Sequence, residues 1–365
     1  MFSRSPIIAA LLASAGTVLP VQAVTLADAE ASYHTLQQFY NESIGLWIPS
    51  TGWWNSANLI ADLAAIDGSV KAQSQSVFSN TFREAQLYNL QMQKVVGANY
   101  LPWTPNPHQT NGFLNSYYDD EGWWALAWIA AYDVTGNGQY LSTAESIFED
   151  MKAAAGTTPC DGLIWWDKNH TYVNAIANEL FLDVAAHLAN RGGNRASYYL
   201  SWAKKQWASF KGSGMINDQN TINDGLNITT CQNNGGTVWS YNQGVILGGL
   251  TELSKATKDN AYITIAKQIA DAAIANLTDS CEPDCGADGS QFKGVFARNL
   301  QILQQASPEA RYATFLQDNA NSIWANDREW QDELSLIWSG PFIQPANAST
   351  QSSALDAIVG ALATS

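Results

Sequence analysis

The chain has 365 residues, of which 14% are charged, and its formal net charge at pH 7 is −15. A chain this acidic is repelled by the phosphates of nucleic acids and by anionic membrane surfaces, so neither is an expected partner. Its length suits one large domain or two ordinary ones.

Residues 1–23 have the pattern of a secretory signal peptide. A short basic start ending at Arg4 precedes an apolar run over 7–19 that is too short to span a bilayer, and Val21-Gln22-Ala23 is a small-residue cleavage pattern. A buried first helix is the alternative, but Pro20 and the cleavage pattern argue against it. We therefore expect a secreted, extracellular protein whose mature chain begins near Val24 and does not insert into a membrane.

Apolar and amphipathic periodicity predicts helices over most of the remaining chain. Alternating β patterns are nearly absent, and no Pro- or Ser-rich linker divides the chain, so we expect one domain over 24–365. The expected helices are 26–45, 55–67, 73–94, 121–134, 138–154, 173–190, 195–210, 242–256, 259–277, 293–305, 308–325 and 351–363.

A weak repeat organises these helices into pairs. An apolar helix, a short polar turn and a tyrosine near the start of the next helix recur about every 50–60 residues, which indicates stacked helical hairpins. One helix of a pair is apolar on all sides, as in 123–131 and 244–250, and must be buried. Six such hairpins close into a double ring, so the predicted fold is all-α, an (α/α)6 barrel. The last helix, 351–363, is expected to be its twelfth, inner helix rather than a lipid-anchor signal.

Four cysteines follow the signal segment, which suggests two disulfides in an oxidising compartment. We expect Cys160 to pair with Cys231 and Cys281 with Cys285, although three connectivities are possible. A zinc site is the weaker alternative because the four histidines are scattered. We expect no metal and no cofactor. Five Asn-x-Ser/Thr acceptors for N-glycosylation lie at Asn41, Asn169, Asn227, Asn276 and Asn347.

In six successive hairpins all inner helices run parallel, so their N-termini meet at one end of the barrel. The segments before them are rich in aromatic and polar residues, which predicts a cleft lined by tryptophan and tyrosine at that end. These segments are 51–55, 117–120, 172–174, 238–242, 291–294 and 338–342.

Asp119 and Asp120 stand at one of these helix starts, in the run Tyr-Tyr-Asp-Asp-Glu-Gly-Trp-Trp over 117–124. Capping the helix would need only one carboxylate. Two adjacent carboxylates can cleave a glycosidic bond, one as nucleophile and one as acid, and a separation of roughly 5 Å goes with retention of configuration. An inverting enzyme would need a more distant second acid, for which Asp167 and Asp224 are the candidates.

Aromatic and amide side chains near the predicted cleft are candidates for sugar binding. For adjacent tryptophans we expect one ring in the core and one exposed, because helical neighbours point about 100° apart. For the asparagines, capping and buried hydrogen bonding are the competing interpretation. Lys293 is the only cation that we find at an inner-helix start, where it would pair with a catalytic or a structural carboxylate. The remaining candidates are Trp53, Trp54, Tyr118, Trp123, Trp124, Trp166, Tyr172, Asn174, Asn178, Trp239, Tyr241 and Asn242.

Other chemistries find little support in the sequence. It contains no Gly-x-Ser-x-Gly elbow, no phosphate-binding loop, no His-Glu-x-x-His run and no calcium loop.

The motif around the two aspartates resembles glycoside hydrolase family 76, which contains endo-α-1,6-mannanases and fungal cell-wall mannan-processing proteins. The resemblance covers nearly the whole mature chain and extends to the segments 162–167, 172–178, 237–244 and 291–296. It implies an (α/α)6 barrel, retaining chemistry and α-1,6-mannan or manno-oligosaccharides as substrate. By the motif, Asp119 corresponds to the nucleophile and Asp120 to the general acid/base.

Three functions follow from this resemblance. The first is a secreted retaining endo-α-1,6-mannanase, which we expect to act as a monomer. The second is a cell-wall transglycosylase that passes the same covalent intermediate to a sugar hydroxyl, on α-1,6-mannan or on the mannose core of GPI-linked glycans. The third is a non-catalytic mannan-binding protein, against which the intact aspartate pair argues.

Overall fold

The computed structural model describes residues 23–66, 68–89, 112–277 and 286–364, and almost all of its regular structure is helical. All twelve expected helices are present in this part of the chain, with one short additional helix, α10. Their bounds are α1 Leu26–Gln38, α2 Trp53–Ala65, α3 Lys71–Asn89, α4 Tyr118–Thr135, α5 Gly138–Ala153, α6 Ala175–Arg191, α7 Ala196–Gly212, α8 Ser240–Thr257, α9 Ala261–Asn276, α10 Gly286–Gly289, α11 Phe292–Ala306, α12 Ala310–Asn326 and α13 Ala348–Leu362.

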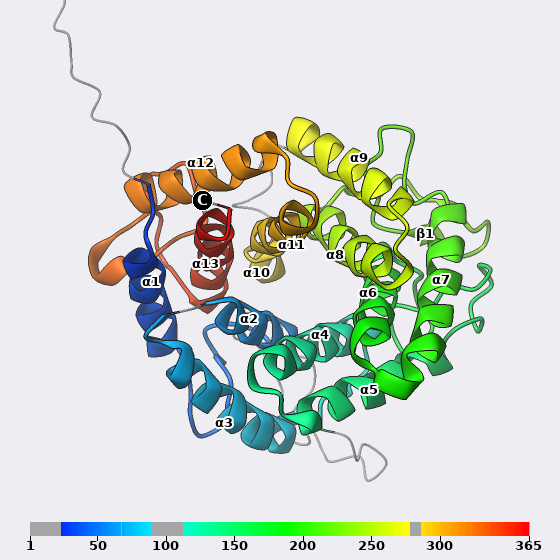
Figure 1. Ribbon diagram of the computed structural model, residues 1–365, viewed down its shortest axis with the longest axis horizontal. Helices are drawn as coiled ribbons and strands as arrows, with labels where there is room; N and C mark the ends of the chain where they lie inside the picture. Colours follow the sequence, from blue (N-terminus) through cyan, green and yellow to red (C-terminus); the bar gives the residue numbers. More distant parts are fainter. Residues whose placement is uncertain (1–22, 67, 90–111, 278–285, 365) are drawn as a thin grey trace, which may run out of the picture.

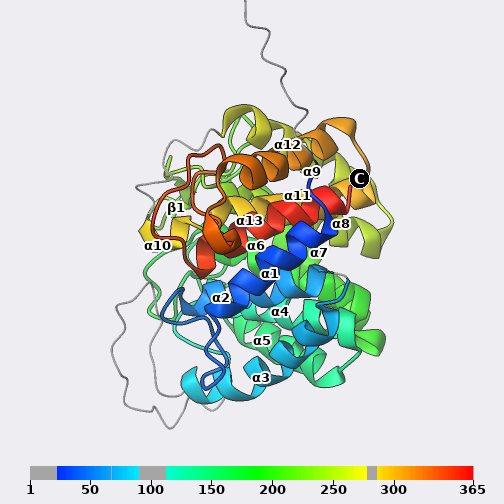
Figure 2. The same ribbon diagram turned by 90° about the vertical axis from the view of Figure 1, so that its left-hand side faces the viewer.

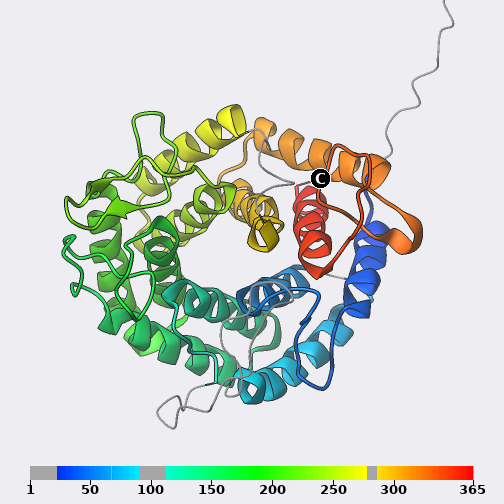
Figure 3. The ribbon, with the colours of Figure 1, turned by 180° about the vertical axis from the view of Figure 1, so that it is seen from behind.

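The long helices form two concentric rings (Figure 1). The inner ring consists of α2, α4, α6, α8, α11 and α13, and each of these helices packs against the next around the ring. The outer ring consists of α1, α3, α5, α7, α9 and α12, and the same arrangement is seen from behind in Figure 3. The predicted (α/α)6 barrel is therefore confirmed.

Burial explains which helices lie inside. Most residues of α6 and α8 and nearly all of α13 are buried, whereas α9 and α12 bury only one face each. The inner helices approach one another closely at glycines. A Cβ on Gly122 of α4 would lie 2.7 Å from the Cβ of Leu180 on α6, and one on Gly294 of α11 would lie 2.5 Å from the Cα of Ser353 on α13. The glycine after the aspartate pair is thus required by helix packing.

The parallel inner helices give the barrel two different ends. We call the end where they begin the cleft mouth and the end where they finish the far mouth. In the side view of Figure 2, α10 and the strand β1 (Leu226–Asn227) lie toward the cleft mouth on the left, and the C-terminus of α13 lies at the far mouth on the right.

Two loops cover part of the cleft mouth. Residues 213–239 carry the two-stranded sheet of β1 (Leu226–Asn227) and β2 (Gln232–Asn233), which pair antiparallel. The disulfide between Cys160 and Cys231 ties this loop to the loop over 154–174. The first expected disulfide is confirmed. The other expected pair, Cys281 with Cys285, lies outside the described residues, as does the expected signal segment up to residue 22.

Several expected boundaries differ from the observed ones. Helix α1 ends at Gln38 instead of residue 45, because Gly45, with φ of 67°, and a bridge between Asn41 and Leu46 turn the chain there. The segment 338–342 does not start a helix. Asn347 caps α13 by accepting a hydrogen bond from the backbone N of Thr350, so that helix begins at Ala348. Within the described ranges, no helix combines the length and apolarity that crossing a bilayer requires.

Candidate active site

Asp119 and Asp120 lie in the first turn of α4, directly at the cleft mouth. The helix begins at Tyr118, three residues before the expected start at 121, after the extended N-cap Tyr117. Asp119 is half-buried and Asp120 is fully buried. Backbone N–H groups at a helix N-terminus carry partial positive charge, which stabilises carboxylates at this position.

A cavity of about 280 Å³ opens beside this turn. Eight of the candidates named from the sequence line it, and they come from the inner helices α2, α4 and α8 and from the two loops. None of the described residues that line it is a lysine or an arginine. The lining residues are Trp54, Asp119, Trp123, Trp166, Tyr172, Asn174, Asp224, Tyr241, Asp288 and Phe292.

The carboxylate of Asp119 is oriented by a tryptophan. The indole Nε1 of Trp166 donates to Asp119 Oδ2 at 2.9 Å. The loop that carries Trp166 is held against the start of α4 because Tyr118 N donates to the carbonyl of Trp166 at 2.9 Å. Asp119 Oδ1 is buried and has no hydrogen-bond partner among the described residues. One oxygen of this carboxylate is therefore fixed by the protein, and the other is left without a protein donor.

Asp224 forms a second oriented carboxylate across the cavity. Tyr172 donates its hydroxyl to Asp224 Oδ2 at 2.7 Å, and Trp239 donates its Nε1 to Asp224 Oδ1 at 3.1 Å. Asn234 in turn donates to the Tyr172 hydroxyl at 2.8 Å. Burial and the Asp224 carboxylate raise the pKa of Tyr172, so its hydroxyl remains protonated and acts as a donor.

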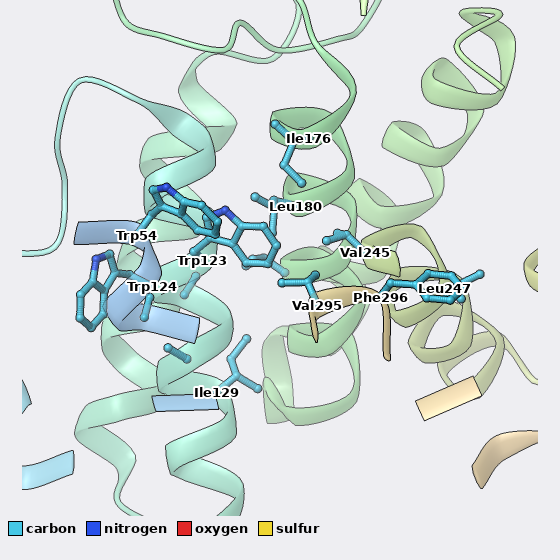
Figure 4. Close-up of a cluster of buried hydrophobic side chains, with 14 of the residues drawn as sticks. Trp54, Trp123, Trp124, Ile129, Ile176, Leu180, Val245, Leu247, Val295 and Phe296 are labelled. Carbon is cyan, nitrogen blue, oxygen red and sulfur yellow. The ribbon is translucent and has the colours of Figure 1, made fainter. Parts of the chain in front are cut away.

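Two tryptophans form an aromatic wall of the cavity. Trp54 of α2 and Trp123 of α4 stack with ring centroids 5.6 Å apart and an angle of 28° between their planes. Figure 4 shows both rings together, with Trp123 facing Leu180 and Val245, while Trp124 points away from them. Trp54 is held further by its Nε1, which donates to Asp288 Oδ1 at 2.8 Å. Flat stacked rings of this kind suit the apolar face of a sugar ring.

The pairs Trp53-Trp54 and Trp123-Trp124 each divide between the core and the cavity, but the expectation of one exposed ring in each pair is wrong. Trp53 and Trp124 are packed against each other and against Phe113 between the two helical rings, so they do not reach the cavity. Trp54 and Trp123 reach it, although they are only 4% exposed each. The expected exposed partner in each pair is thus a cavity wall rather than a surface ring.

Acidic groups gather around and beneath the cavity. Burial raises the pKa of Tyr241 well above its ordinary value, and the carboxylates of Asp224 and Asp119 raise it further. Glu179 of α6 is fully buried, and neither of its side-chain oxygens has a hydrogen-bond partner among the described residues. Burial raises the pKa of Glu179 well above its ordinary value, and the carboxylates of Asp224 and Asp183 raise it further.

Two other candidates, Tyr118 and Asp167, lie near the cleft mouth without lining the cavity. Tyr118 is 8% exposed, and Lys168 Nζ lies 5.4 Å from the centre of its ring. Asp167 closes a turn by accepting from the backbone N of Asn169 at 2.7 Å and that of Thr171 at 3.2 Å.

The asparagine candidates divide between the two interpretations. Asn174 lines the cavity and also caps α6, accepting from the backbone N of Ala177 at 3.3 Å. Asn178 is buried and joins α6 to the backbone of Ile164 in both directions. Asn242 is buried on α8 outside the lining set, and neither polar atom of its side chain has a partner among the described residues. The structure therefore brings only Asn174 to the cavity.

Lys293 lies at the start of α11 as expected, but it does not line the cavity. Lys293 donates to the carbonyl of Leu336 at 2.5 Å and lies 4.5 Å from the centre of the Trp338 ring. Lys168 instead pairs with Glu121 of α4, with Nζ 2.7 Å from Oε1. The sequence places Lys168 one residue after Asp167, but its contact with α4 depends on how the loop folds back.

Other residues of the site were missed at the sequence level. Asp288 and Phe292 line the cavity, and the Phe292 ring stacks on Tyr241 at 4.0 Å. Asn115 donates its Nδ2 to Asp120 Oδ2 at 2.7 Å. The only signal for Asn115 was its position four residues before the aspartate pair. Among the described residues, no group of three or more His, Cys, Asp or Glu side chains is arranged to hold a metal ion.

Comparison with known proteins assigns a family. The model of glycosyl hydrolase family 76 matches residues 22–365. The chain is 28% identical over 295 residues to the mannan endo-1,6-alpha-mannosidase DFG5 of Candida albicans, a match that covers 74% of this chain and 62% of that protein. The chain thus spans about three-fifths of the length of this relative.

Solved structures share the fold. The GH76A alpha-1,6-mannanase of a Salegentibacter species superimposes with a TM-score of 0.76 at 19% identity, covering 93% of this chain and 99% of that one. An inactive variant of that enzyme, with two consecutive aspartates replaced by asparagine, was solved with α-1,6-mannotriose. Dfg5 of Chaetomium thermophilum, solved with glucosamine, has a TM-score of 0.75 at 18% identity, with coverage of 94% and 92%. By its family match, the chain belongs to glycosyl hydrolase family 76.

Proposed function

We propose that this family 76 protein is a retaining endo-α-1,6-mannanase, which cleaves α-1,6-linked mannan backbones through a covalent glycosyl-enzyme. The observation that carries the proposal is the position of Asp119. Its carboxylate lines the cavity, is oriented by Trp166, and stands next to Asp120 in the same helical turn. The stacked rings of Trp54 and Trp123 lie on the same cavity.

In the first step Asp119 attacks the anomeric carbon of the mannose that rests against the aromatic wall. The bond from that carbon to the glycosidic oxygen breaks, and Asp120 gives its proton to the departing oxygen. The product is an ester between Asp119 and the mannosyl unit, with inverted configuration at the anomeric carbon. Developing positive charge on the sugar is stabilised by the acidic cavity, whose described lining carries three carboxyls and neither lysine nor arginine.

In the second step the ionised Asp120 removes a proton from water. The resulting oxygen nucleophile attacks the anomeric carbon, the ester to Asp119 breaks, and a second inversion restores the original α configuration. Asp120 ends the cycle protonated, as it began. The adjacency of the two aspartates on one turn of α4 supports retention, since this mechanism needs its carboxyls only about 5–5.5 Å apart.

The choice of mannan as substrate rests on related proteins. The Candida albicans relative is named a mannan endo-1,6-alpha-mannosidase, and the Salegentibacter enzyme was solved with an α-1,6-mannotriose. An extracellular location is also part of the proposal, and it is supported by the signal-like pattern over 1–23 and by the disulfide between Cys160 and Cys231.

The test is incubation with debranched α-1,6-mannan and with intact branched mannan, followed by sizing of the products and NMR of the first anomer released. We expect internal cleavage of the debranched polymer and release of the α anomer. Release of the β anomer would contradict retention, and no cleavage of either polymer would contradict a hydrolase. Chain-lengthened products at high oligosaccharide concentration would instead indicate a transglycosylase.

A further inference from the structure

A series of buried polar contacts holds the carboxyl of Asp120, and the sequence motif does not reveal them. Asn115 is 7% exposed and lies on the segment leading into α4. Its Nδ2 donates to Asp120 Oδ2 at 2.7 Å, and its Oδ1 accepts from the backbone N of Tyr117 at 2.9 Å. Since a backbone N–H can only donate, this second bond fixes which end of the amide faces Asp120.

The chain continues to Glu121 and Lys168. The backbone N of Asn115 donates to Glu121 Oε1 at 3.0 Å, and Lys168 Nζ lies 2.7 Å from the same oxygen. Lys168 also contacts Asp150 at 2.8 Å, and its own backbone N donates to the carbonyl of Ser116 at 2.9 Å. Glu121 is fully buried, and its Oε1 contacts both donors, whereas its Oε2 has no hydrogen-bond partner among the described residues.

We propose that Asn115, braced by Glu121 and Lys168, is the positioning residue for the acid/base Asp120. This inference rests on the proposed function. A donor bonded to Oδ2 holds the carboxyl in one rotamer and disfavours a proton on that oxygen, so the transferred proton is carried by Oδ1. Asn115 thereby sets the direction in which Asp120 delivers its proton to the glycosidic oxygen and later receives one from water.

Asn115 could position Asp120 or could only support the fold, and these two roles predict different rates on substrates with different leaving groups. The 2,4-dinitrophenolate leaving group of an aryl α-1,6-mannobioside departs without protonation. The leaving groups of phenyl glycosides and of mannan need a proton from the acid. The kcat/KM value reports the step that forms the glycosyl-enzyme. A misplaced acid therefore lowers kcat/KM for poor leaving groups alone, whereas a damaged fold lowers it for all substrates by the same factor.

The experiment compares Asn115→Ala with the wild type on these substrates. We expect kcat/KM on mannan and on the phenyl glycoside to fall about 10- to 100-fold, the effect of losing one hydrogen bond to a charged group. On the dinitrophenyl glycoside we expect a loss below about threefold, since that step bypasses the acid. The slope of log kcat/KM against the pKa of the leaving group becomes steeper in the variant.

The matched control is Asn190→Ala at the far mouth, where Asn190 Nδ2 donates to Glu252 Oε2 at the same distance of 2.7 Å. We expect its kcat/KM to be unchanged on every substrate. Should Asn115→Ala fail to fold, Lys168→Gln removes the brace at a side chain that is 32% exposed, and the same selective loss is expected at a few-fold.

Three outcomes overturn the proposal. An equal loss on both leaving groups would make Asn115 structural, and no loss on either would make it irrelevant. In both cases a wild type that cleaves mannan leaves the proposed function intact. A wild type that cleaves neither mannan nor the aryl glycosides would refute the proposed function and this inference together.

Discussion

The carboxylates that line the two cavities of the barrel have different partners. At the cleft mouth, Asp119 and Asp224 accept hydrogen bonds from neutral donors, two indoles and a tyrosine hydroxyl. At the far mouth, a cavity of about 320 Å³ is rimmed by carboxylates that face cations. Arg191 binds Glu252 at 2.9 Å, and Arg298 binds buried acids of α2 and α13.

This difference separates the carboxylates that are available for catalysis from those that stabilise the fold. A neutral donor orients a carboxylate without neutralising it, so the charge remains available to a substrate. In a buried ion pair the two charges compensate each other within the protein. Removing one partner leaves the other charge uncompensated. The two cavities share Trp123 in their walls, so the aromatic wall of the site also closes the far cavity. We therefore expect changes at the cleft mouth to affect rates and changes at the far mouth to affect stability.

The largest effect is expected for Asp119→Asn. Loss of the nucleophile should lower kcat on α-1,6-mannan by about four orders of magnitude or more, as for other covalent catalysts. The unfolding midpoint should change little, because the amide can still accept from Trp166. Initial rates and thermal unfolding measure both effects. Retention of more than about a tenth of the activity would contradict the role of Asp119.

Arg298→Ala should have the largest effect on stability. Arg298 bridges Asp62 at 2.5 Å and Asp356 at 3.0 Å, and both acids are buried. We expect the free energy of unfolding to fall by about 3–5 kcal/mol, the cost of leaving a buried pair without its partner. Arg83→Ala, at an arginine that is 66% exposed, is the control and should change it by less than about 0.5 kcal/mol. The free energy of unfolding is measured in urea. Equal values for Arg298→Ala and Arg83→Ala would contradict this prediction.

Glu252 gives the far mouth a defined pH dependence. Burial alone would raise the pKa of Glu252, but His187 and Arg191 outweigh it and lower the value from 4.5 to about 2. Because the pKa is lower in the folded state, the stabilisation is fully present above pH 4.5 and is lost as the pH falls toward 2. Glu252→Gln should therefore cost roughly 3 kcal/mol of unfolding free energy at pH 7.

Urea unfolding of wild type and Glu252→Gln at several pH values between 7 and 3 measures this effect. The difference in unfolding free energy between the wild type and Glu252→Gln should narrow steadily as the pH falls below the ordinary pKa of the carboxyl. A gap that stayed constant across the series would show that the charge on Glu252 contributes nothing. Activity of the variant at pH 7 should equal that of the wild type at temperatures where both are folded.

The smallest effect is expected for Trp166→Phe, which keeps an aromatic ring but removes the donor to Asp119. Losing one hydrogen bond to a charged group costs about 1.5–3 kcal/mol, so kcat should fall roughly 10- to 100-fold. Trp165→Phe is the neighbouring control, because its ring packs on His170 and its Nε1 has no partner among the described residues. Equal kcat values for Trp166→Phe and Trp165→Phe would show that the hydrogen bond from Trp166 to Asp119 does not contribute to catalysis.

Local sequence patterns predicted the helices well, because burial on all sides or on one stripe is a property of each helix. They also predicted the position of Asp119 and the division of the Trp53-Trp54 pair. They did not predict Asn115, Asp288 or Lys168. Asp288 and Lys168 act through contacts between segments far apart in the chain, with Trp54 and Glu121 respectively. Asn115 contacts the nearby Asp120, but no local pattern records how the segment before α4 folds onto the helix start.

The expected site was also too broad for a physical reason. Asn178 and Asp167 carry the residue types that bind sugars, but the same types satisfy buried backbone groups and close turns. Lys293 lies at an inner-helix start as expected, yet the chain around Trp338 covers it. The sequence identified which helix starts matter, and the structure selected which of their side chains reach the cavity.

The most direct test of the account is to trap the glycosyl-enzyme. Asp120→Ala should form the ester rapidly from a 2,4-dinitrophenyl α-1,6-mannobioside, since that leaving group needs no acid, and should hydrolyse it slowly without a base. Intact mass spectrometry should then show one added mannobiosyl unit, and peptide mapping should place it on Asp119. An adduct on any other residue, or β-mannobiose released with no adduct at any time, would contradict the account.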